Sequence, residues 1–127
     1  MPEAVLDASA VLAVLNGEPG GETVRPVLHD SVISTVNLSE VISKLVENGV
    51  DGRTAVRLTD AQPFRPMDHT LGLARIAGTL RAETRAAGLS LGDRACLALA
   101  LAMELPVYTA DRAWQGLPLD IEVRPIR

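Results

Sequence analysis

The sequence predicts a three-layer α/β/α sandwich around a central parallel sheet, and two observations support that prediction. Short apolar runs alternate with segments of helical periodicity along the whole chain. Strands separated by helices need crossover connections, which give parallel strands with helices on both faces. With 127 residues, 47% of them hydrophobic, the chain is also long enough to bury a core of its own. We therefore expect residues 1–127 to form a single domain.

Five short runs are the candidate strands, and proline and glycine mark many of their limits. In chain order they are Ala4–Leu6, Ser31–Ser34, Pro63–Met67, Pro106–Thr109 and Ile121–Val123. Pro63 and Pro66 bracket the third run. Because proline has no backbone N–H to donate to a neighbouring strand, the third strand is expected at an edge of the sheet.

The clearest helix lies at residues 38–46, where apolar side chains follow the i, i+3, i+4, i+7 spacing of an amphipathic helix. Asn48 and Gly49 are expected to end it. The other candidate helices are Ala8–Leu15, Glu22–His29, Asp51–Asp60, Thr70–Ala87, Leu91–Leu105 and a short turn over Asp111–Gly116.

Three of these helices carry further expectations. Pro26 should kink the second candidate helix, unless it lies in the first turn. Val56 and Leu58 are the expected packing contacts of the helix at residues 51–60. The helix Leu91–Leu105 is apolar on nearly all sides, which indicates that it packs against several neighbours.

Composition narrows the class of function. A net charge of −4 argues against binding nucleic acid through phosphate neutralisation alone, but it leaves room for a nuclease whose carboxylates bind divalent cations. Three aromatic residues are too few for a base-stacking platform, and one cysteine excludes a disulfide scaffold. The longest apolar run, Ala95–Met103, is too short to cross a bilayer. With acids in place of a signal peptide's apolar region, we expect a soluble cytoplasmic protein without membrane contact.

Four acids lie where predicted strands end or predicted helices begin. Asp7 ends the first strand, Asp111 follows the fourth, and Glu40 and Asp93 lie near the starts of helices. In open α/β sheets the carboxyl ends of the strands meet at one edge, where ligands bind. All four acids could therefore face that edge.

Each acid taken alone has a structural explanation. Asn37-x-x-Glu40 and Ser90-x-x-Asp93 have the spacing of capping boxes, in which an acid bonds back to the start of its helix. Glu40 could also pair with Lys44, one helical turn further on. The first and last acids could cap the helices that follow them.

Taken together, the acids indicate a metal site. Asp7 ends an apolar strand and Asp93 opens an apolar helix, positions where an isolated carboxylate is costly to desolvate. Several carboxylates close together at neutral pH need a shared proton or a divalent cation. Oxygen ligands favour Mg²⁺ or Mn²⁺, and neither His29 nor His69 has the spacing of a metal ligand.

Four segments carry a resemblance to a known family, in order and in spacing. The segments are Val5–Ala10, Asn37–Val41, Leu89–Asp93 and Tyr108–Arg112. They resemble the four acidic motifs of PIN-domain ribonucleases, and most of all the small VapC-type toxins of bacterial and archaeal toxin–antitoxin pairs. The resemblance runs from end to end of the chain. It implies a single PIN-like domain with a parallel sheet in the strand order 3-2-1-4-5.

The resemblance also implies an activity, a Mg²⁺- or Mn²⁺-dependent endoribonuclease that leaves 5′-phosphate and 3′-hydroxyl ends. The catalytic, metal-holding residues would be Asp7, Glu40, Asp93 and Asp111. Ser9 and Thr109 match polar positions that support the first and last acids. The implied partners are an RNA substrate, a small cognate antitoxin protein that blocks the acidic cleft, and a second copy of the chain in a homodimer.

Two arginines directly follow acids of these motifs. Arg94 and Arg112 are therefore candidates for contact with RNA phosphates, or for balancing the carboxylates when no metal is bound.

Other functions remain open at this point. His29 and His69 could form a metal-free acid/base pair that cleaves RNA through its 2′-hydroxyl. A receiver-like regulatory domain also has clustered acids, but it requires a lysine after the last core strand. The one lysine of this chain, Lys44, lies much earlier in the sequence. A dehalogenase-like phosphatase wants an acid where Ser9 stands. A PIN-fold protein that binds without catalysis is the remaining alternative.

Overall fold

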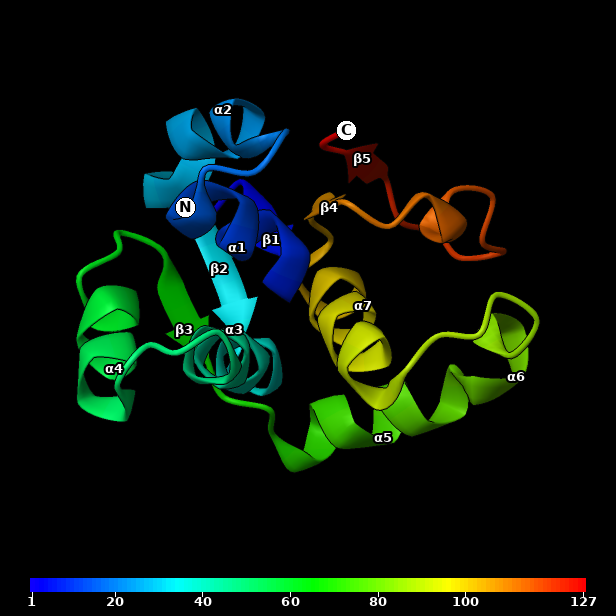
Figure 1. Ribbon diagram of the computed structural model, residues 1–127. Coiled ribbons are helices and arrows are strands. Elements are labelled where there is room, and N and C mark those ends of the chain that lie inside the picture. Colours follow the sequence, from blue (N-terminus) through cyan, green and yellow to red (C-terminus); the bar gives the residue numbers. More distant parts are fainter.

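A five-stranded parallel sheet lies at the centre of the computed structural model, which describes residues 1–127 (Figure 1). The strands are β1 (Ala4–Leu6), β2 (Ser31–Ser34), β3 (Arg65–Met67), β4 (Val107–Thr109) and β5 (Val123–Pro125). Their order is β3-β2-β1-β4-β5, and all neighbouring pairs are parallel. The α/β/α class and the strand order are confirmed. The proline-bracketed strand is at an edge, as its missing donors predict.

Helices cover both faces of this sheet. They are α1 (Ala8–Asn16), α2 (Gly21–Val24), α3 (Thr35–Glu47), α4 (Gly52–Asp60), α5 (Leu71–Thr79), α6 (Arg81–Thr84) and α7 (Leu91–Met103), with 3₁₀ helices η1 (Arg25–Asp30) and η2 (Arg112–Trp114). No helix has the length and apolar character required to cross a bilayer.

Two of the predicted helices are each broken in two. The expected helix at residues 22–29 is α2 followed by η1, whose first turn holds Pro26. Proline cannot donate the backbone bond that would continue α2, so the chain tightens there. The expected helix at residues 70–87 ends at Thr79, whose hydroxyl donates to the carbonyl of Ile76 at 2.8 Å. That local bond competes with the backbone hydrogen bonds that would continue the helix. The preceding Gly78 also lowers the helix propensity of this segment.

Two boundaries and one packing face also differ from expectation. Helix α7 ends two residues early because Glu104 has a left-handed φ of 55°. Strand β5 begins at Val123 rather than at residue 121, in register with Val107. Helix α4 turns Val56 and Leu58 outward, with exposed fractions of 43% and 39%. It packs instead through smaller side chains, so the choice of face was wrong.

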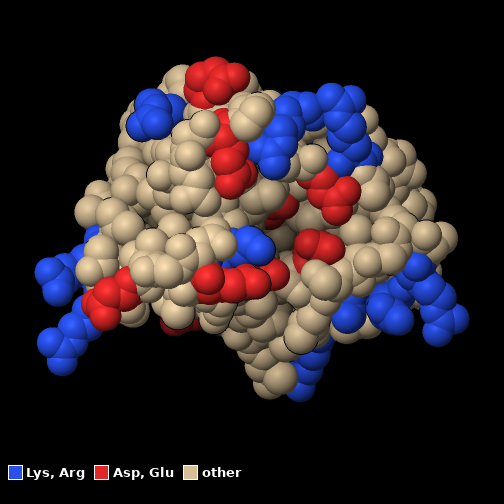
Figure 2. Space-filling model, viewed as in Figure 1, with Lys and Arg blue, Asp and Glu red and all other residues tan.

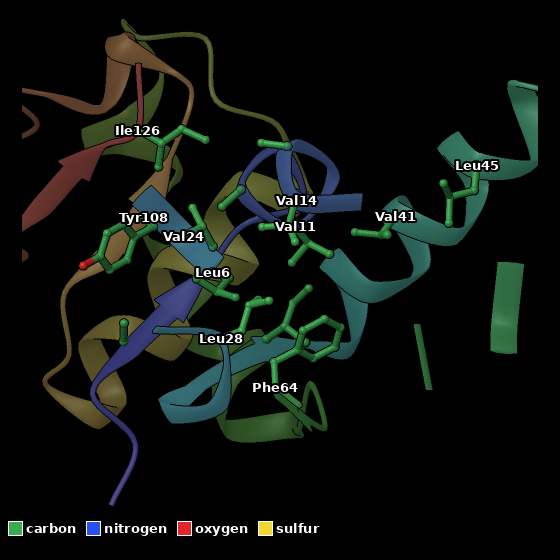
Figure 3. Close-up of a cluster of buried hydrophobic side chains, with 14 of the residues drawn as sticks. Leu6, Val11, Val14, Val24, Leu28, Val41, Leu45, Phe64, Tyr108 and Ile126 are labelled. Carbon is green, nitrogen blue, oxygen red and sulfur yellow. The ribbon is translucent and has the colours of Figure 1, made fainter. Parts of the chain in front are cut away.

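Alternating side chains of the strands divide the core in two. Leu6 faces one side of the sheet and packs with α1, α2, η1 and α3, in the cluster drawn in Figure 3. Val5 faces the other side with Val32 and Val107, against α5 and α7. Side chains on both faces of β1 are buried. Polar groups can therefore approach solvent only beyond the carboxyl end of this strand.

The C-terminal segment closes the fold against the turn that precedes α2. Ile126 is buried, and its N–H donates to the carbonyl of Thr109 at 3.0 Å. Gly20 lies directly beneath it with a φ of 96°, and a methyl group there would overlap the Ile126 carbonyl. Gly20 therefore allows a close approach as well as a left-handed turn.

Replacing Gly20 by alanine should test this closure. Gly49 is the matched control, because its φ of 99° is nearly the same and nothing lies within 4 Å of a methyl group there. Both substitutions strain the backbone by about 1–2 kcal/mol. Gly20→Ala should cost about 2 kcal/mol more in free energy of unfolding, measured with urea, because the C-terminal segment must move. Equal losses in the two variants would contradict the proposed packing.

Candidate functional site

The four predicted acids are distributed around the carboxyl edge of the sheet. Asp7 directly follows β1, and Asp111 lies two residues after β4. Glu40 is on α3, the helix that follows β2, and Asp93 is in the first turn of α7. In Figure 2 acidic surface surrounds a hollow, at the place where α1, α3, α7 and β4 converge in Figure 1. Parallel strands explain the shared edge, because each carboxyl end opens on the same side.

Asp7 is the most deeply placed of these acids, with an exposed fraction of 6%. Its Oδ1 accepts from the Ser9 hydroxyl at 2.6 Å and from the Ala10 N–H at 2.9 Å, and the second contact caps α1. Its Oδ2 accepts from the Thr109 hydroxyl at 2.5 Å. Burial raises the pKa of Asp7 from 3.8 to about 6, against the lowering effect of these bonds, and the charge of Asp93 adds to the rise.

The same two hydroxyls join β1 to β4. Ser9 Oγ accepts from the N–H of Ala110 at 2.9 Å, and Thr109 Oγ1 accepts from the N–H of Asp111 at 3.0 Å. Each hydroxyl thus donates to Asp7 and accepts from the chain that leads to Asp111. Thr109 therefore links the carboxylate of Asp7 to the backbone N–H of Asp111.

Glu40 is held from two sides. Its Oε1 accepts from Asn37 Nδ2 at 2.7 Å. The other amide hydrogen of Asn37 points to the carbonyl of Gly92, at 2.9 Å from Nδ2. A methyl group at Gly92 would lie 2.6 Å from either carboxylate oxygen of Glu40. Sequence patterns paired Asn37 with Glu40 only through the spacing of a capping box, and Gly92 was marked only as the neighbour of Asp93 within a motif.

Asp93 and Asp111 both cap helices. Asp93 Oδ2 accepts from the N–H of Ser90 at 2.9 Å, which completes the predicted capping box. Asp111 Oδ1 accepts from the N–H of Ala113 at 2.9 Å and caps η2. Capping therefore accounts for one oxygen of each carboxylate.

The surroundings of the buried Cys96 thiol on α7 include the charges of three of the acids. Burial raises the pKa of Cys96 well above its usual range, and the charges of Asp7, Asp93 and Glu40 raise it further. All three carboxylates therefore lie within electrostatic range of one point on α7.

The acids do not form a closed cage. No group of three or more Asp, Glu, His or Cys side chains is gathered tightly enough to enclose a metal ion. Each carboxylate instead turns at least one oxygen toward a hydrogen-bond donor of the chain, three of them at a helix start.

The residues nevertheless fit a divalent cation. The donor set is oxygen only, as Mg²⁺ and Mn²⁺ prefer. Asp7 is charged at neutral pH only at the expense of stability, and its three donors are neutral groups. A cation near Asp7 would supply the missing positive charge.

Two expectations about α3 are wrong. The helix begins at Thr35 and is capped by Ser34, whose hydroxyl oxygen accepts from the N–H of Val36 at 3.2 Å. Asn37 is therefore inside the helix and is not a capping residue. Lys44 pairs with Glu47 at 3.5 Å and not with Glu40.

The two candidate arginines have different surroundings. Arg94 is half-buried, and its Nη1 donates to the carbonyl of Ala77 at 3.1 Å. Arg112 is exposed on η2, next to Asp111. Neither forms a salt bridge with one of the four acids.

The histidine alternative is excluded by topology. His29 lies in η1, before β2, and so at the amino edge of the sheet. His69 follows β3 and lies at the carboxyl edge. The length of a strand separates the two imidazoles, which cannot act on one phosphate together.

Comparison with known proteins identifies the family. The model of the PIN domain matches residues 4–118, which is most of the chain. The chain belongs to the PIN domain family. No curated protein sequence matches it.

Several solved structures share the fold. VapC20 of Mycobacterium tuberculosis, a toxin that cleaves the sarcin-ricin loop, superposes with a TM-score of 0.79 at 17% identity, covering 97% of this chain and 100% of that one. A toxin–antitoxin complex from Klebsiella pneumoniae gives 0.76 at 20% identity over 98% of both chains. DNA-bound VapBC from Salmonella typhimurium gives 0.76 at 19% identity over 100% of both. At these identities the likeness establishes the common fold.

Removing the charge of Asp7 should stabilise the metal-free protein at neutral pH. The folded state holds the Asp7 proton up to about pH 6, whereas the unfolded state releases it near 3.8. Stability therefore falls as pH rises through this window, by about 3 kcal/mol in total. Asn is neutral throughout, so Asp7→Asn should raise the free energy of unfolding by up to about 3 kcal/mol at pH 7.5 and by much less at pH 4.

Urea unfolding in EDTA from pH 4 to 8 measures this difference. The control is Asp120→Asn, at an exposed acid in the loop before β5. A gain in stability for Asp7→Asn that does not change with pH would show that the buried charge is not its cause.

Proposed function

We propose that the chain is an endoribonuclease that uses Mg²⁺ or Mn²⁺ to hydrolyse RNA phosphodiester bonds, and that it is the toxin of a type II toxin–antitoxin pair. The observation that carries this proposal is the buried carboxylate of Asp7 at the carboxyl edge of the sheet, held by Ser9, Ala10 and Thr109 and close enough to Asp93 for the charge of Asp93 to raise its pKa. Membership of the PIN domain family supports it, as does the match to four acidic motifs.

The residues proposed to hold the cation are Asp7, Glu40, Asp93 and Asp111. A divalent cation bound there supplies acidity to a water molecule and stabilises negative charge on phosphate oxygens. The chain's own part is to keep the carboxylates in place. Ser9 and Thr109 orient Asp7 through both of its oxygens, and Thr109 also fixes the start of the turn that holds Asp111. Attack by water on phosphorus with breakage of the P–O3′ bond, the leaving O3′ taking up a proton, would give a 5′-phosphate and a 3′-hydroxyl.

A groove next to Glu40 offers a path for a single strand. It has a volume of about 370 Å³ between α1 and α3, and it is lined by Ala8, Leu12, Ser39, Glu40, Ser43, Lys44 and Glu47. The hydroxyls of Ser39 and Ser43 are suitable donors to phosphate oxygens, whereas the Lys44 ammonium is paired with Glu47. Arg112 is the stronger choice of the two arginines for a further phosphate contact, because Arg94 already donates to a backbone carbonyl.

The proposed protein partners are a small antitoxin and a second copy of the chain. Structures with this fold include toxin–antitoxin complexes from Klebsiella pneumoniae and Salmonella typhimurium, which supports an antitoxin here. An edge rich in carboxylates would attract a basic segment of such a partner. We place the whole activity in one PIN-like domain, residues 1–127, acting in the cytoplasm.

The receiver-like alternative does not fit the sheet. Receiver domains have the order 2-1-3-4-5, in which the first strand lies between the second and the third. Here β1 lies between β2 and β4. A PIN-fold protein that only binds RNA retains the right topology, and the test of activity below separates it from the nuclease.

Asp7→Asn and Asp93→Asn should each reduce cleavage of structured RNA by roughly 10³-fold or more, since a ligand of the cation is lost. The fold should persist in both, and Asp120→Asn should cleave like the wild type. The assay compares Mg²⁺, Mn²⁺ and EDTA, and analyses the product ends. Cleavage that continues in EDTA, or ends that carry a cyclic or 3′-phosphate, would refute the metal mechanism. A wild type that binds RNA but never cuts it would favour the binding protein.

A further inference from the structure

The carboxylate of Glu40 lies between two residues to which the proposed mechanism gives no role. Asn37 donates to Oε1 from the preceding turn of α3. Gly92 lies against the carboxylate from α7, because a methyl group there would approach both oxygens to 2.6 Å and Glu40 would have to leave its observed position. Glu40 itself is on the exposed side of α3, where a glutamate without such contacts would sample many rotamers.

The amide of Asn37 can adopt only one orientation. Its two hydrogens point to two acceptors, Glu40 Oε1 and the carbonyl of Gly92. Rotation by half a turn would place Oδ1 against these same acceptors, which have no hydrogen to give. In the observed orientation Oδ1 is buried without a partner, in a residue that is 1% exposed.

This arrangement is unfavourable for the core by itself. A buried acceptor without a hydrogen bond destabilises the fold, whereas an apolar side chain of similar size would avoid that cost. The benefit of the amide must therefore lie in the two groups that it holds. One is the Glu40 carboxylate, and the other is the backbone of α7 directly before Asp93.

We propose that Asn37 and Gly92 are positioning residues that fix the carboxylate of Glu40 for a divalent cation. The inference rests on the proposed function, because the cation is the one that the nuclease would use. Ordering a glutamate side chain costs conformational entropy, and the two contacts offset that cost before the cation arrives. The hydrogen bond from Asn37 to the carbonyl of Gly92 also ties α3, which carries Glu40, to the turn of α7 that carries Asp93.

Asn37→Leu tests the amide side. Leucine has a similar volume and no donors, and it removes the unpaired Oδ1. The affinity of the full-length, metal-free protein for Mn²⁺, measured by titration with detection of free Mn²⁺ by EPR, should fall about 10- to 100-fold. The midpoint of urea unfolding should stay the same or rise. Thr59→Ala is the control, since it removes a buried 2.9 Å bond to the carbonyl of Val56 on α4 and leaves the acids untouched.

Gly92→Ala tests the other side without touching a hydrogen-bonding side chain. Alanine has a higher helix propensity than glycine, so α7 should not be weakened. Its methyl group should displace the carboxylate of Glu40 and lower the affinity for Mn²⁺ by a similar factor. Gly78→Ala is the control, because a methyl group on that helical glycine meets nothing within 4 Å.

The results separate the inference from the proposed function. Lower affinity in both variants with unchanged controls supports the positioning role. Wild-type affinity in either variant overturns it, and RNA cleavage by the wild type would then leave the nuclease standing. If the wild type cuts no RNA but both variants bind Mn²⁺ more weakly than it does, the positioning role stands and the nuclease is refuted. A wild type that binds no Mn²⁺ would overturn both.

Discussion

The carboxylate of Asp7 connects three parts of the molecule: the end of β1, the first turn of α1 and the end of β4. It is a charged group almost wholly removed from water, so it must be hydrogen-bonded to be tolerated. Its donors are the hydroxyls of Ser9 and Thr109 and the backbone of α1. Three neutral donors hold the group in place without cancelling its charge, which is the state that the proposed cation would require.

The acids at this edge combine structural and chemical roles. Asp7, Asp93 and Asp111 each cap a helix with one oxygen, which places a negative charge at the positive end of the helix dipole. A cap occupies only part of a carboxylate, so a second oxygen is left for other partners. A structural explanation of each acid and a functional explanation of the group are therefore compatible. Glu40 differs, since it caps nothing and depends on Asn37 for its orientation.

Local sequence patterns accounted for most elements and failed where contacts between elements decide. The apolar periodicity located α3, and Pro63 and Pro66 marked β3 as an edge strand. On α4 the larger residues Val56 and Leu58 indicated the wrong face, because close approach to α3 selected smaller side chains. The order of the strands came from the resemblance of motifs, since periodicity does not say which strands are neighbours.

By itself, the sequence determined that Asp7, Asp93 and Asp111 lie at the end of a strand or the start of a helix, because those boundaries follow from short-range patterns, whereas Glu40 lies further inside α3 than the pattern indicated. Only the tertiary structure decided what each acid touches. Thr109 reaches Asp7 across 102 positions of the chain, and Asn37 reaches Gly92 across 55. Such contacts depend on how the sheet brings distant segments together, and neither hydroxyl nor amide carries a local signal of its partner. The capping role of Ser34 and the burial of Asn37 were likewise settled by where α3 meets the strand before it.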